Sequence, residues 1–476
     1  MEKFHPEEEI SQVRCYGATT KGSIHDKNGK PMQDRSLQHV FGDNNENLII
    51  AVSDGHGSDP YFRSEIGAQL AIDISTRLVE DFVREFEYGS SWPNFVQRGT
   101  ELDRSNRDPY AEMQFRHLFE MIIAEWREAV ENHLSDNPLT DEEYINASSK
   151  HDNSVKELYE EQGAVKMSIY GCTLIVAVRT QDYWFAFRMG DGTCEALDKD
   201  NNWFSPLPWD AQCENNVTTS LCEYGAESFT YCYGNILPTG LFIASDGIDD
   251  SFGGVHEGAT PAEQIEWFRN IIMDIYHANL DWPESSVEHL LNSLRHYDDK
   301  SLRLWLDTSN MPHVFDGVVE QSVSYQEHKL EQCKAYIDKK EKEIGNLEHE
   351  IGILEENNKV DEVYVNTLEE ENTHIAVRKN YIDCALGKLK SYIGYVTSIG
   401  DKIKERISKH QSEIIEVERQ AKQNQDDIQA SKERMKETTS EIFVKQTMLK
   451  SYRRELDEVY RPMLSQIEQR IKELKE

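Results

Sequence analysis

The chain has 476 residues, of which 51 are Lys or Arg and 87 are Asp or Glu, so its formal charge is −36. This length predicts two or three structural units with a hydrophobic core of ordinary size. The charge excludes proteins that work by neutralising nucleic-acid phosphates or by binding anionic membrane surfaces.

No uninterrupted apolar stretch approaches the roughly 20 residues that a membrane-spanning helix needs. The N-terminus lacks the basic and then apolar segments of a secretion signal. The eight cysteines are scattered and form no Cys-x-x-Cys pair, which is typical of free thiols in a reducing compartment. We therefore expect a cytoplasmic protein.

The negative charge belongs to the first two-thirds of the chain. Residues 321–476 contain 27 basic and 31 acidic residues, which leaves 24 basic and 56 acidic residues for the preceding part. The net charges are therefore −4 and −32. With the change in composition, this predicts a first domain over residues 1–312, a linker over 313–325 and a helical region over 326–476.

The first domain combines predicted strands and helices. Short runs rich in β-branched and aromatic residues predict strands at residues 48–52, 173–178, 183–187, 241–244 and 301–306. Apolar residues at helical spacing predict helices at residues 62–86, 110–134 and 261–278. Because strands and helices do not alternate strictly, we expect an α+β layered domain.

The last third of the chain shows a seven-residue repeat and has no proline between Pro312 and Pro462. One apolar position of the repeat includes Leu330, Ile337, Ile344 and Ile351, and a second position three residues later includes Cys333, Leu347 and Leu354. Apolar residues at the a and d positions of many heptads predict a coiled coil.

Two arrangements of this coiled coil remain open. Polar residues and a glycine interrupt the apolar seam near its middle, namely Asn358, Asp361, Asn372, Lys379 and Gly400. These favour an antiparallel helical hairpin that reverses near residue 400 or near residues 357–358. The unbroken register across Gly400 favours a continuous rod of roughly 200 Å or more. In either arrangement we expect oligomerisation or docking of a partner helix.

Several aspartates lie where a predicted strand ends, next to a glycine or another acid: Asp54, Asp191, Asp246 and Asp298. A further one, Asp34, follows residues 29–33. Rigid strands with glycine turns can present such carboxylates together. Converging carboxylates predict a site for Mg²⁺ or Mn²⁺ rather than Zn²⁺, which prefers His and Cys ligands.

Seven short segments carry these residues: Ser-Ile-His at 23–25, Gly-Lys-Pro-Met-Gln-Asp at 29–34, Ala-Val-Ser-Asp-Gly-His-Gly at 51–57, Gly-Cys-Thr at 171–173, Gly-Asp-Gly at 190–192, Ala-Ser-Asp-Gly at 244–247 and Asp-Asp-Lys-Ser at 298–301. In kind and order they resemble the metal-dependent Ser/Thr protein phosphatases of the 2C type in their bacterial style, over about residues 10–308. The resemblance implies an α-β-β-α sandwich with a two-metal centre at one end.

The resemblance also implies metal ligands at the matched positions. Asp54 would bridge two Mg²⁺ or Mn²⁺ ions, and the carbonyl of Gly55 would bind one of them. Asp246 and Asp298 would complete the protein ligands of the first ion. Asp34 would hold the second ion, directly or through water.

Two further matched residues have implied roles. Asp191 matches the position that binds a third, weaker metal ion in some members. His56 matches the general acid that protonates the leaving seryl or threonyl oxygen. In this chemistry two ions about 3.5–4 Å apart activate a water for in-line attack on phosphorus, and no phosphoenzyme forms. The chain has no His-Cys-x5-Arg loop of the kind that cysteine phosphatases use.

The chain departs from the family pattern near Asp34. Many members carry a phosphate-binding arginine five residues earlier, where this chain has Gly29, and many have an acid in place of Gln33. The candidates to replace the arginine are His25, Lys27 and Lys30. No main metal ligand is lost, so we expect catalysis.

Residues 200–268 contain no Lys or Arg and include the segment that covers the active site in the family, with Trp203, Pro206, Pro208 and Trp209 as candidate contacts. This acidic surface predicts phosphoprotein substrates with basic flanks, phosphorylated by a cognate Ser/Thr kinase. The alternatives are a pseudophosphatase scaffold, which the missing arginine favours, and a related phosphatase of small molecules.

Overall fold

The computed structural model describes residues 13–57, 61–88, 109–143, 165–207, 212–213, 218–253, 260–393 and 400–476. The chain divides into two compact units, Met1–Ser322 and Val323–Glu476, which are described separately. Within the described residues, no helix is both long and apolar enough to cross a membrane.

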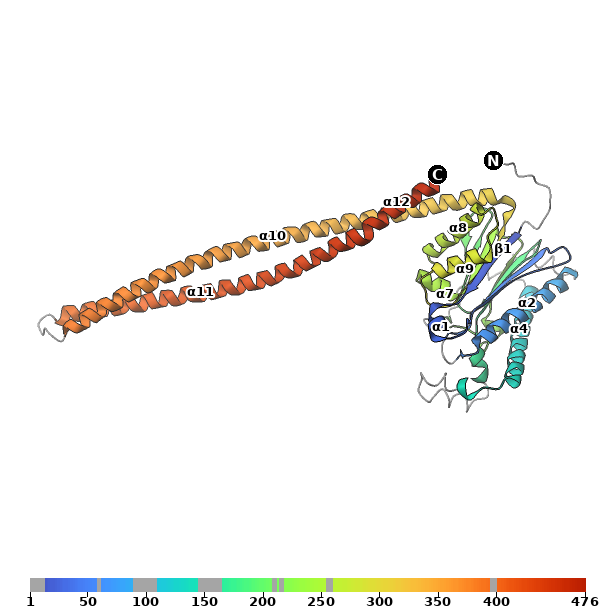
Figure 1. The fold of residues 1–476 in the computed structure, drawn as a ribbon, viewed down its shortest axis with the longest axis horizontal. Coiled ribbons are helices and arrows are strands. Elements are labelled where there is room, and N and C mark those ends of the chain that lie inside the picture. Colours follow the sequence, from blue (N-terminus) through green and yellow to red (C-terminus); the bar gives the residue numbers. More distant parts are fainter. Residues whose placement is uncertain are drawn as a thin grey trace. The chain divides into compact units, whose positions relative to one another are not determined.

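The first unit contains two five-stranded antiparallel sheets (Figure 1). The first sheet has the order β1-β10-β9-β6-β7 and consists of Val13–Thr20 (β1), Lys300–Asp307 (β10), Gly240–Ala244 (β9), Thr193–Leu197 (β6) and Trp203–Phe204 (β7). The second sheet has the order β2-β3-β4-β5-β8 and consists of Arg35–Phe41 (β2), Asn47–Ser53 (β3), Leu174–Arg179 (β4), Trp184–Met189 (β5) and Thr230–Gly234 (β8).

The two sheets pack face to face around a shared apolar core. Along β3, Ile50 and its alternate neighbours pack with Leu241 and Ile243 of the other sheet. The residues between them, Ile49 and Ala51, pack with the helices on the outer side. Because both faces of β3 are buried, its sequence is a continuous apolar run rather than an alternating one.

Helices cover both outer faces (Figure 1). The second sheet is covered by α2 (Ser64–Tyr88) and α4 (Pro109–Asp136), and α8 (Ala262–His277) and α9 (Glu284–Ser293) lie over the first sheet. The shorter elements are α1 (Ser23–Asn28), α7 (Asp246–Asp249) and 3-10 turns at Val165–Tyr170, Ala226–Ser228, Asp250–Phe252 and Thr308–Asn310. The predicted α-β-β-α sandwich is confirmed.

Residues 313–325, the expected linker, are helical and belong to the first turns of α10 (Met311–Ile393). Within the first unit, the ring of Phe315 stacks on that of Tyr276 with 4.1 Å between their centroids. The Ser322 hydroxyl donates a hydrogen bond of 2.9 Å to the carboxylate of Glu266. These contacts hold the beginning of the helix on α8.

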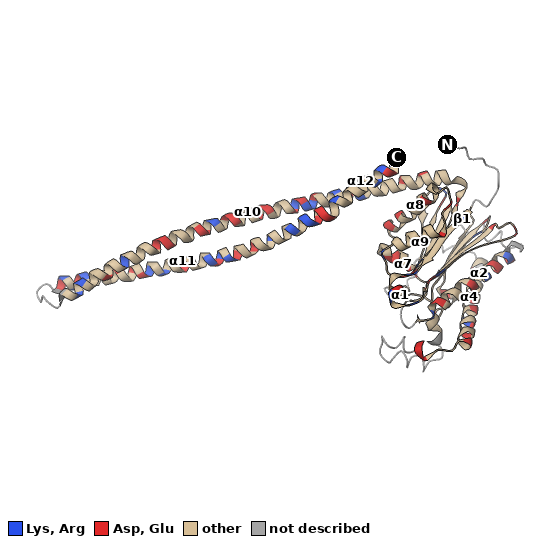
Figure 2. Cartoon of the chain, in the orientation of Figure 1, with Lys and Arg blue, Asp and Glu red and all other residues tan. Residues whose placement is uncertain are grey.

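The second unit is an antiparallel hairpin of α10 and α11 (Gly400–Glu455), followed by a π-helical turn at Leu456–Tyr460 and α12 (Arg461–Lys475). Residue numbers fall on one helix as they rise on the other in the cross-helix ion pairs Glu350–Lys445, Asp361–Arg434 and Lys379–Glu418. Residues 394–399, between the two helices, lie outside the described part. Of the two open arrangements, the hairpin is therefore the one observed. Acidic and basic residues are interspersed along both helices (Figure 2).

Candidate metal centre

The second sheet places Asp34 and Asp54 side by side. Asp34 directly precedes β2 and Asp54 directly follows β3, and these two strand ends are paired because Arg35 lies opposite Ser53. The two carboxyl groups are within hydrogen-bonding reach of each other. Antiparallel pairing thus converts two distant sequence positions into one site.

The first sheet contributes the other three predicted aspartates. Asp246 follows β9 and Asp298 comes shortly before β10, and these strands pair with each other. Asp191 precedes β6, whose first residue lies opposite Ala244, the last residue of β9. All three aspartates therefore lie at the same end of this sheet.

The two sets of carboxylates meet across the sandwich. The carboxyl group of Asp54 is hydrogen-bonded to that of Asp246, and, in addition to burial, the nearby charges of Asp34 and Asp298 raise its pKa. In addition to burial, the charge of Asp191 likewise raises the pKa of Asp246. The structure thus brings together all five aspartates that the sequence singled out.

This crowding of acids shifts their pKa values upward. Burial and then the charge of Asp299 raise the pKa of Asp34 to about 7. For Asp54, burial and then the charge of Asp246 raise the pKa well above its usual value. Burial does the same for the pKa of Asp246. The charged forms of these groups oppose one another in the absence of a compensating cation.

The donor set fits a hard divalent cation. Oδ2 of Asp34 is buried and has no hydrogen-bond partner among the described residues. A cation among these oxygens would satisfy that atom and offset the mutual repulsion of the carboxylates. Oxygen ligands without thiolates suit Mg²⁺ or Mn²⁺ rather than Zn²⁺.

The loop after β3 is held by residues 171–173. The backbone N–H of Asp54 donates to the Thr173 hydroxyl at 3.1 Å, and the N–H of Thr173 donates to the Asp54 carbonyl at 2.8 Å. Gly55 forms an isolated bridge with Cys172. A Cβ on Gly55 would lie 2.8 Å from the carbonyl oxygen of Gln33, so this close approach requires glycine.

His56 is fixed beside this loop. Its backbone N–H donates to the Gly171 carbonyl at 3.1 Å. Its ring packs edge to face against that of Tyr61, with 4.8 Å between the ring centroids. A Cβ on Gly171 would lie 2.6 Å from Cδ2 of His56. Burial lowers the pKa of His56 to about 4, so the metal-free site holds the imidazole in its neutral form at pH 7.

The sequence analysis missed Asp299. Its carboxylate accepts the backbone N–H of Gly22 and that of Gln33, each at 2.6 Å, and lies 2.9 Å from Nδ1 of His25. Although burial opposes its ionisation, these donors lower the pKa of Asp299. The only sequence signal for this residue is its position directly after Asp298.

The three side chains that could replace the phosphate-binding arginine lie in different surroundings. His25 is buried between Asp298 and Asp299. Lys27 is exposed. Nζ of Lys30 donates to the Gly57 carbonyl at 2.7 Å and is therefore held next to the loop of His56.

The segment expected to cover the site lies partly elsewhere. Trp203 belongs to β7, and its ring stacks on Phe268 of α8 with 6.0 Å between centroids. It is therefore a packing residue of the outer layer and not a substrate contact. Pro208 and Trp209 lie outside the described residues.

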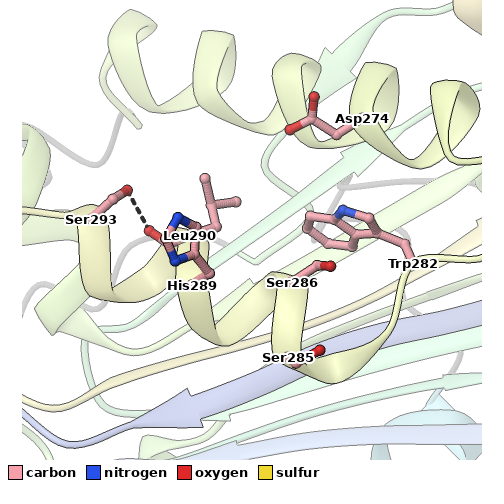
Figure 3. Close-up of a pocket in the computed structure, with 7 residues that line it drawn as sticks. All are labelled: Asp274, Trp282, Ser285, Ser286, His289, Leu290 and Ser293. Carbon is pink, nitrogen blue, oxygen red and sulfur yellow. Dashed lines mark hydrogen bonds between the residues drawn. The ribbon is translucent and has the colours of Figure 1, made fainter.

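A separate pocket of about 540 Å³ lies between α8 and α9 (Figure 3). Its lining consists of Asp274, Trp282, Ser285, Ser286, His289, Leu290 and Ser293. It contains one carboxylate and none of the aspartates at the strand ends. The hydroxyl of Ser293 is turned back to the Leu290 carbonyl at 2.6 Å. This pocket does not reproduce the donor set of the carboxylate cluster.

A family model described as Protein phosphatase 2C matches residues 21–281, which is more than half of the chain. Comparison with curated proteins gave no match.

Among solved structures, the catalytic domain of the serine threonine protein phosphatase PstP in complex with two manganese ions is 13% identical, with a TM-score of 0.34 over 62% of this chain and 97% of that chain. The S. agalactiae serine/threonine phosphatase is 14% identical, with a TM-score of 0.33 over 62% and 99%. RsbX in complex with magnesium is 13% identical, with a TM-score of 0.29 over 63% and 97%.

Proposed function

Because the chain belongs to the protein phosphatase 2C family, and therefore to the metal-dependent protein serine/threonine phosphatases, we propose that the aspartate end of its sandwich hydrolyses phosphoserine and phosphothreonine in proteins. The observation that carries this proposal is the convergence of five aspartates from both sheets on one end of the fold. The resemblance drawn from the sequence motifs is confirmed by the family match.

We assign two Mg²⁺ or Mn²⁺ ions to Asp34, Asp54, the Gly55 carbonyl, Asp246 and Asp298, and a third, weaker ion to Asp191. When bound, such ions polarise water toward hydroxide and offset charge on phosphoryl oxygens. The contribution of the chain is to hold the carboxylates in place. Thr173 fixes the backbone of Asp54 from both sides, so little reorganisation is needed at the moment of reaction.

For His56 we propose the role of general acid toward the leaving seryl or threonyl oxygen. Its backbone and ring are both held, which sets the direction in which the imidazole presents its nitrogens. Because burial lowers its pKa, the protonated form is a strong donor when it forms.

For the missing arginine we propose Lys30 as the replacement. It follows Gly29 directly, and its ammonium group is held at the Gly57 carbonyl. Nearby Asp298 has a side chain that is 41% exposed, so this part of the site is open to solvent. A partly exposed ammonium group at the open side of the carboxylates can meet a phosphate dianion.

For the hairpin we propose self-association through its outer face. In the middle of α10 the seam is polar, and Oδ1 of Asn358 and of Asn372 are buried without a hydrogen-bond partner among the described residues. Val365 and Leu368 of this stretch are buried, but four further apolar residues point outward and are 65–76% exposed, namely Val360, Val363, Val377 and Tyr381. Their spacings of 3, 14 and 4 residues place them on one stripe of the helix.

A second copy is the occupant that the charges favour for this stripe. Residues 321–476 carry a net charge of only −4, so two hairpins repel each other weakly. Light scattering should show a dimer of the full-length protein and a monomer for Val363→Glu/Val377→Glu. Gln446→Glu, at an exposed polar position of α11 next to Lys445, which pairs with Glu350 and not with the stripe, is the control and should stay dimeric. A monomeric wild type would contradict self-association and favour a helix from another protein.

The phosphatase proposal is tested by Mn²⁺-dependent release of phosphate from a phosphoserine peptide. Asp54→Asn and Asp246→Asn should each lower kcat by about 100-fold or more, because each removes an anionic ligand. Asp43→Asn, an exposed aspartate in the turn between β2 and β3, should leave kcat unchanged. Absence of turnover with Mg²⁺ and with Mn²⁺ would favour the alternative of a pseudophosphatase, which is supported by Gly29 at the position of the family's phosphate-binding arginine.

A further inference from the structure

His25 lies among the carboxylates, yet the chemistry proposed above gives it no role. It belongs to α1, and its imidazole is only 4% exposed. Nδ1 lies 2.9 Å from Oδ1 of Asp299, and Nε2 lies 3.6 Å from Oδ1 of Asp298. Burying an imidazole between two carboxylates is costly unless its polar atoms have a use.

Asp299 orients this ring and has no acceptor capacity left for a metal ion. Its Oδ1 accepts the N–H of Gly22 and faces His25, and its Oδ2 accepts the N–H of Gln33 and, at 3.4 Å, that of Asp34. A carboxylate offers about four acceptor positions; three accept backbone N–H groups, and the remaining contact with Nδ1 of His25 is an ion pair of 2.9 Å. Asp299 therefore favours Nδ1 as the protonated nitrogen and leaves Nε2 available on the other side of the ring.

The space beside Nε2 is open because residue 57 is a glycine. A Cβ on Gly57 would lie 3.3 Å from Nε2 of His25 and 3.8 Å from both carboxylate oxygens of Asp298. Two ligand atoms that are each about 2.1 Å from one cation lie about 3 Å apart when they subtend a right angle. The observed separation of 3.6 Å between Nε2 and Oδ1 of Asp298 is close to that span.

We propose that Nε2 of His25 is a nitrogen ligand of a divalent cation that it shares with Asp298, and that Asp299 is the positioning residue of this imidazole. The inference rests on the proposed function, since Asp298 is one of the carboxylates assigned to the ions. Mg²⁺ prefers oxygen ligands, whereas transition metals accept imidazole readily. A nitrogen ligand therefore shifts the preference of this site from Mg²⁺ toward Mn²⁺.

Pulsed EPR spectroscopy of Mn²⁺ bound to the full-length protein tests this proposal, with the histidines either unlabelled or ¹⁵N-labelled. We expect the nitrogen coupling of a directly bound imidazole, which changes with the label. In His25→Gln this coupling should disappear, and the dissociation constant for Mn²⁺ should rise about tenfold or more. The dissociation constant for Mg²⁺ should change less.

His39→Gln is the matched control. His39 is also paired with a carboxylate, since its Nε2 lies 2.7 Å from Glu80, but it belongs to β2 and pairs with a residue of α2. This variant should keep the nitrogen coupling and the Mn²⁺ affinity of the wild type. Asp299→Asn should weaken the coupling because the ring loses the acceptor that orients it, and an unchanged spectrum would overturn the positioning role.

The failures of the two proposals are distinguishable. A wild-type protein that binds no Mn²⁺ overturns the proposed function and this inference with it. A wild-type protein that binds Mn²⁺ and dephosphorylates a peptide, but shows no nitrogen coupling, overturns this inference alone. The labelled wild-type protein alone shows whether a nitrogen ligand is bound to Mn²⁺. The inference therefore stays testable even if a variant fails to fold.

Discussion

At the scale of single residues, the metal centre consists of acids that oppose one another's ionisation. Asp34 and Asp54 lie in contact, and the carboxylates of the first sheet add their charges from across the sandwich. Such an arrangement is stable in two ways: the acids can hold protons, or cations can replace those protons. The balance between the two depends on pH and on metal concentration.

We expect the metal-free protein to lose stability as the pH rises from about 4 to about 7. The pKa of Asp34 is about 7 in the folded protein against an ordinary value of 3.8, so between these values the folded state holds a proton that the unfolded state has lost. Raising the pH therefore favours unfolding in this window.

Thermal unfolding in the presence of EDTA measures this effect. The Tm should fall by on the order of 5 °C between pH 5 and pH 7.5. Asp34→Asn should flatten this dependence, and saturating Mn²⁺ should raise the Tm most at the higher pH. If Asp34→Asn and the wild type show the same dependence on pH, the proton is not held by this carboxyl group.

His56 should matter most for substrates with a poor leaving group. A seryl oxygen needs a proton as it leaves, whereas p-nitrophenolate leaves readily without one. His56→Gln should therefore lower kcat for a phosphoserine peptide by about 100-fold, and kcat for p-nitrophenyl phosphate far less. Equal losses with the two substrates would indicate that His56 only supports the loop after Asp54.

Single residues also show how far the sequence could predict the site. Asp54, Asp191, Asp246 and Asp298 were predictable because each lies at the end of a predicted strand with a glycine or acid beside it, and Asp34 was predictable from the motif at residues 29–34. Asp299 was not, because its role depends on donors at Gly22 and Gln33, which are 277 and 266 residues away. Likewise, the sequence could not show that His25 is buried between two carboxylates whereas Lys30 is held at the Gly57 carbonyl, because both environments depend on the folded chain.

At the scale of secondary-structure elements, the position of His56 depends on how closely α2 approaches the 3-10 turn Val165–Tyr170. Gly67 of α2 makes that approach possible, since a Cβ there would lie 1.8 Å from the carbonyl oxygen of Tyr170. The carbonyl of Gly67 also accepts the indole N–H of Trp126 on α4 at 2.9 Å. The residue that follows the turn, Gly171, accepts the backbone N–H of His56 at its carbonyl.

Gly67→Ala should therefore lower both stability and activity. Overpacking of this kind costs about 1–3 kcal/mol, and the contact with backbone here is at the severe end of that range. Denaturant unfolding and peptide turnover measure the two effects. Gly352→Ala is the control, because the described residues leave open space around that helical glycine, and alanine there should stabilise α10 by about 0.5–1 kcal/mol.

The elements themselves were predictable to different degrees. Burial of both faces of β3 produces a continuous apolar run, so the strand could be located from its sequence. The choice between hairpin and rod could not be made, because the heptad register continues on both sides of residues 394–399. The ion pairs that decide it join residues 39 to 95 positions apart.

At the scale of the whole molecule, the distribution of charge predicts which phosphoproteins bind. The chain carries −32 in residues 1–320 and −4 in the remainder, so the unit with the carboxylate cluster is the strongly negative one. Bound cations offset only the charges at the centre itself. Basic residues around a phosphosite would be attracted by the surrounding field, and acidic ones repelled.

A peptide with Lys and Arg around its phosphoserine should therefore have a higher kcat/KM than one with Glu and Asp, by about tenfold at low salt. The ratio should shrink as salt is added, because the Debye length falls from about 10 Å at 0.1 M to about 3 Å at 1 M. p-Nitrophenyl phosphate, which lacks flanking residues, should show a much weaker dependence on salt. If the acidic peptide is preferred, or if the ratio does not change with salt, specificity comes from shaped contacts at the site and not from the field of the unit.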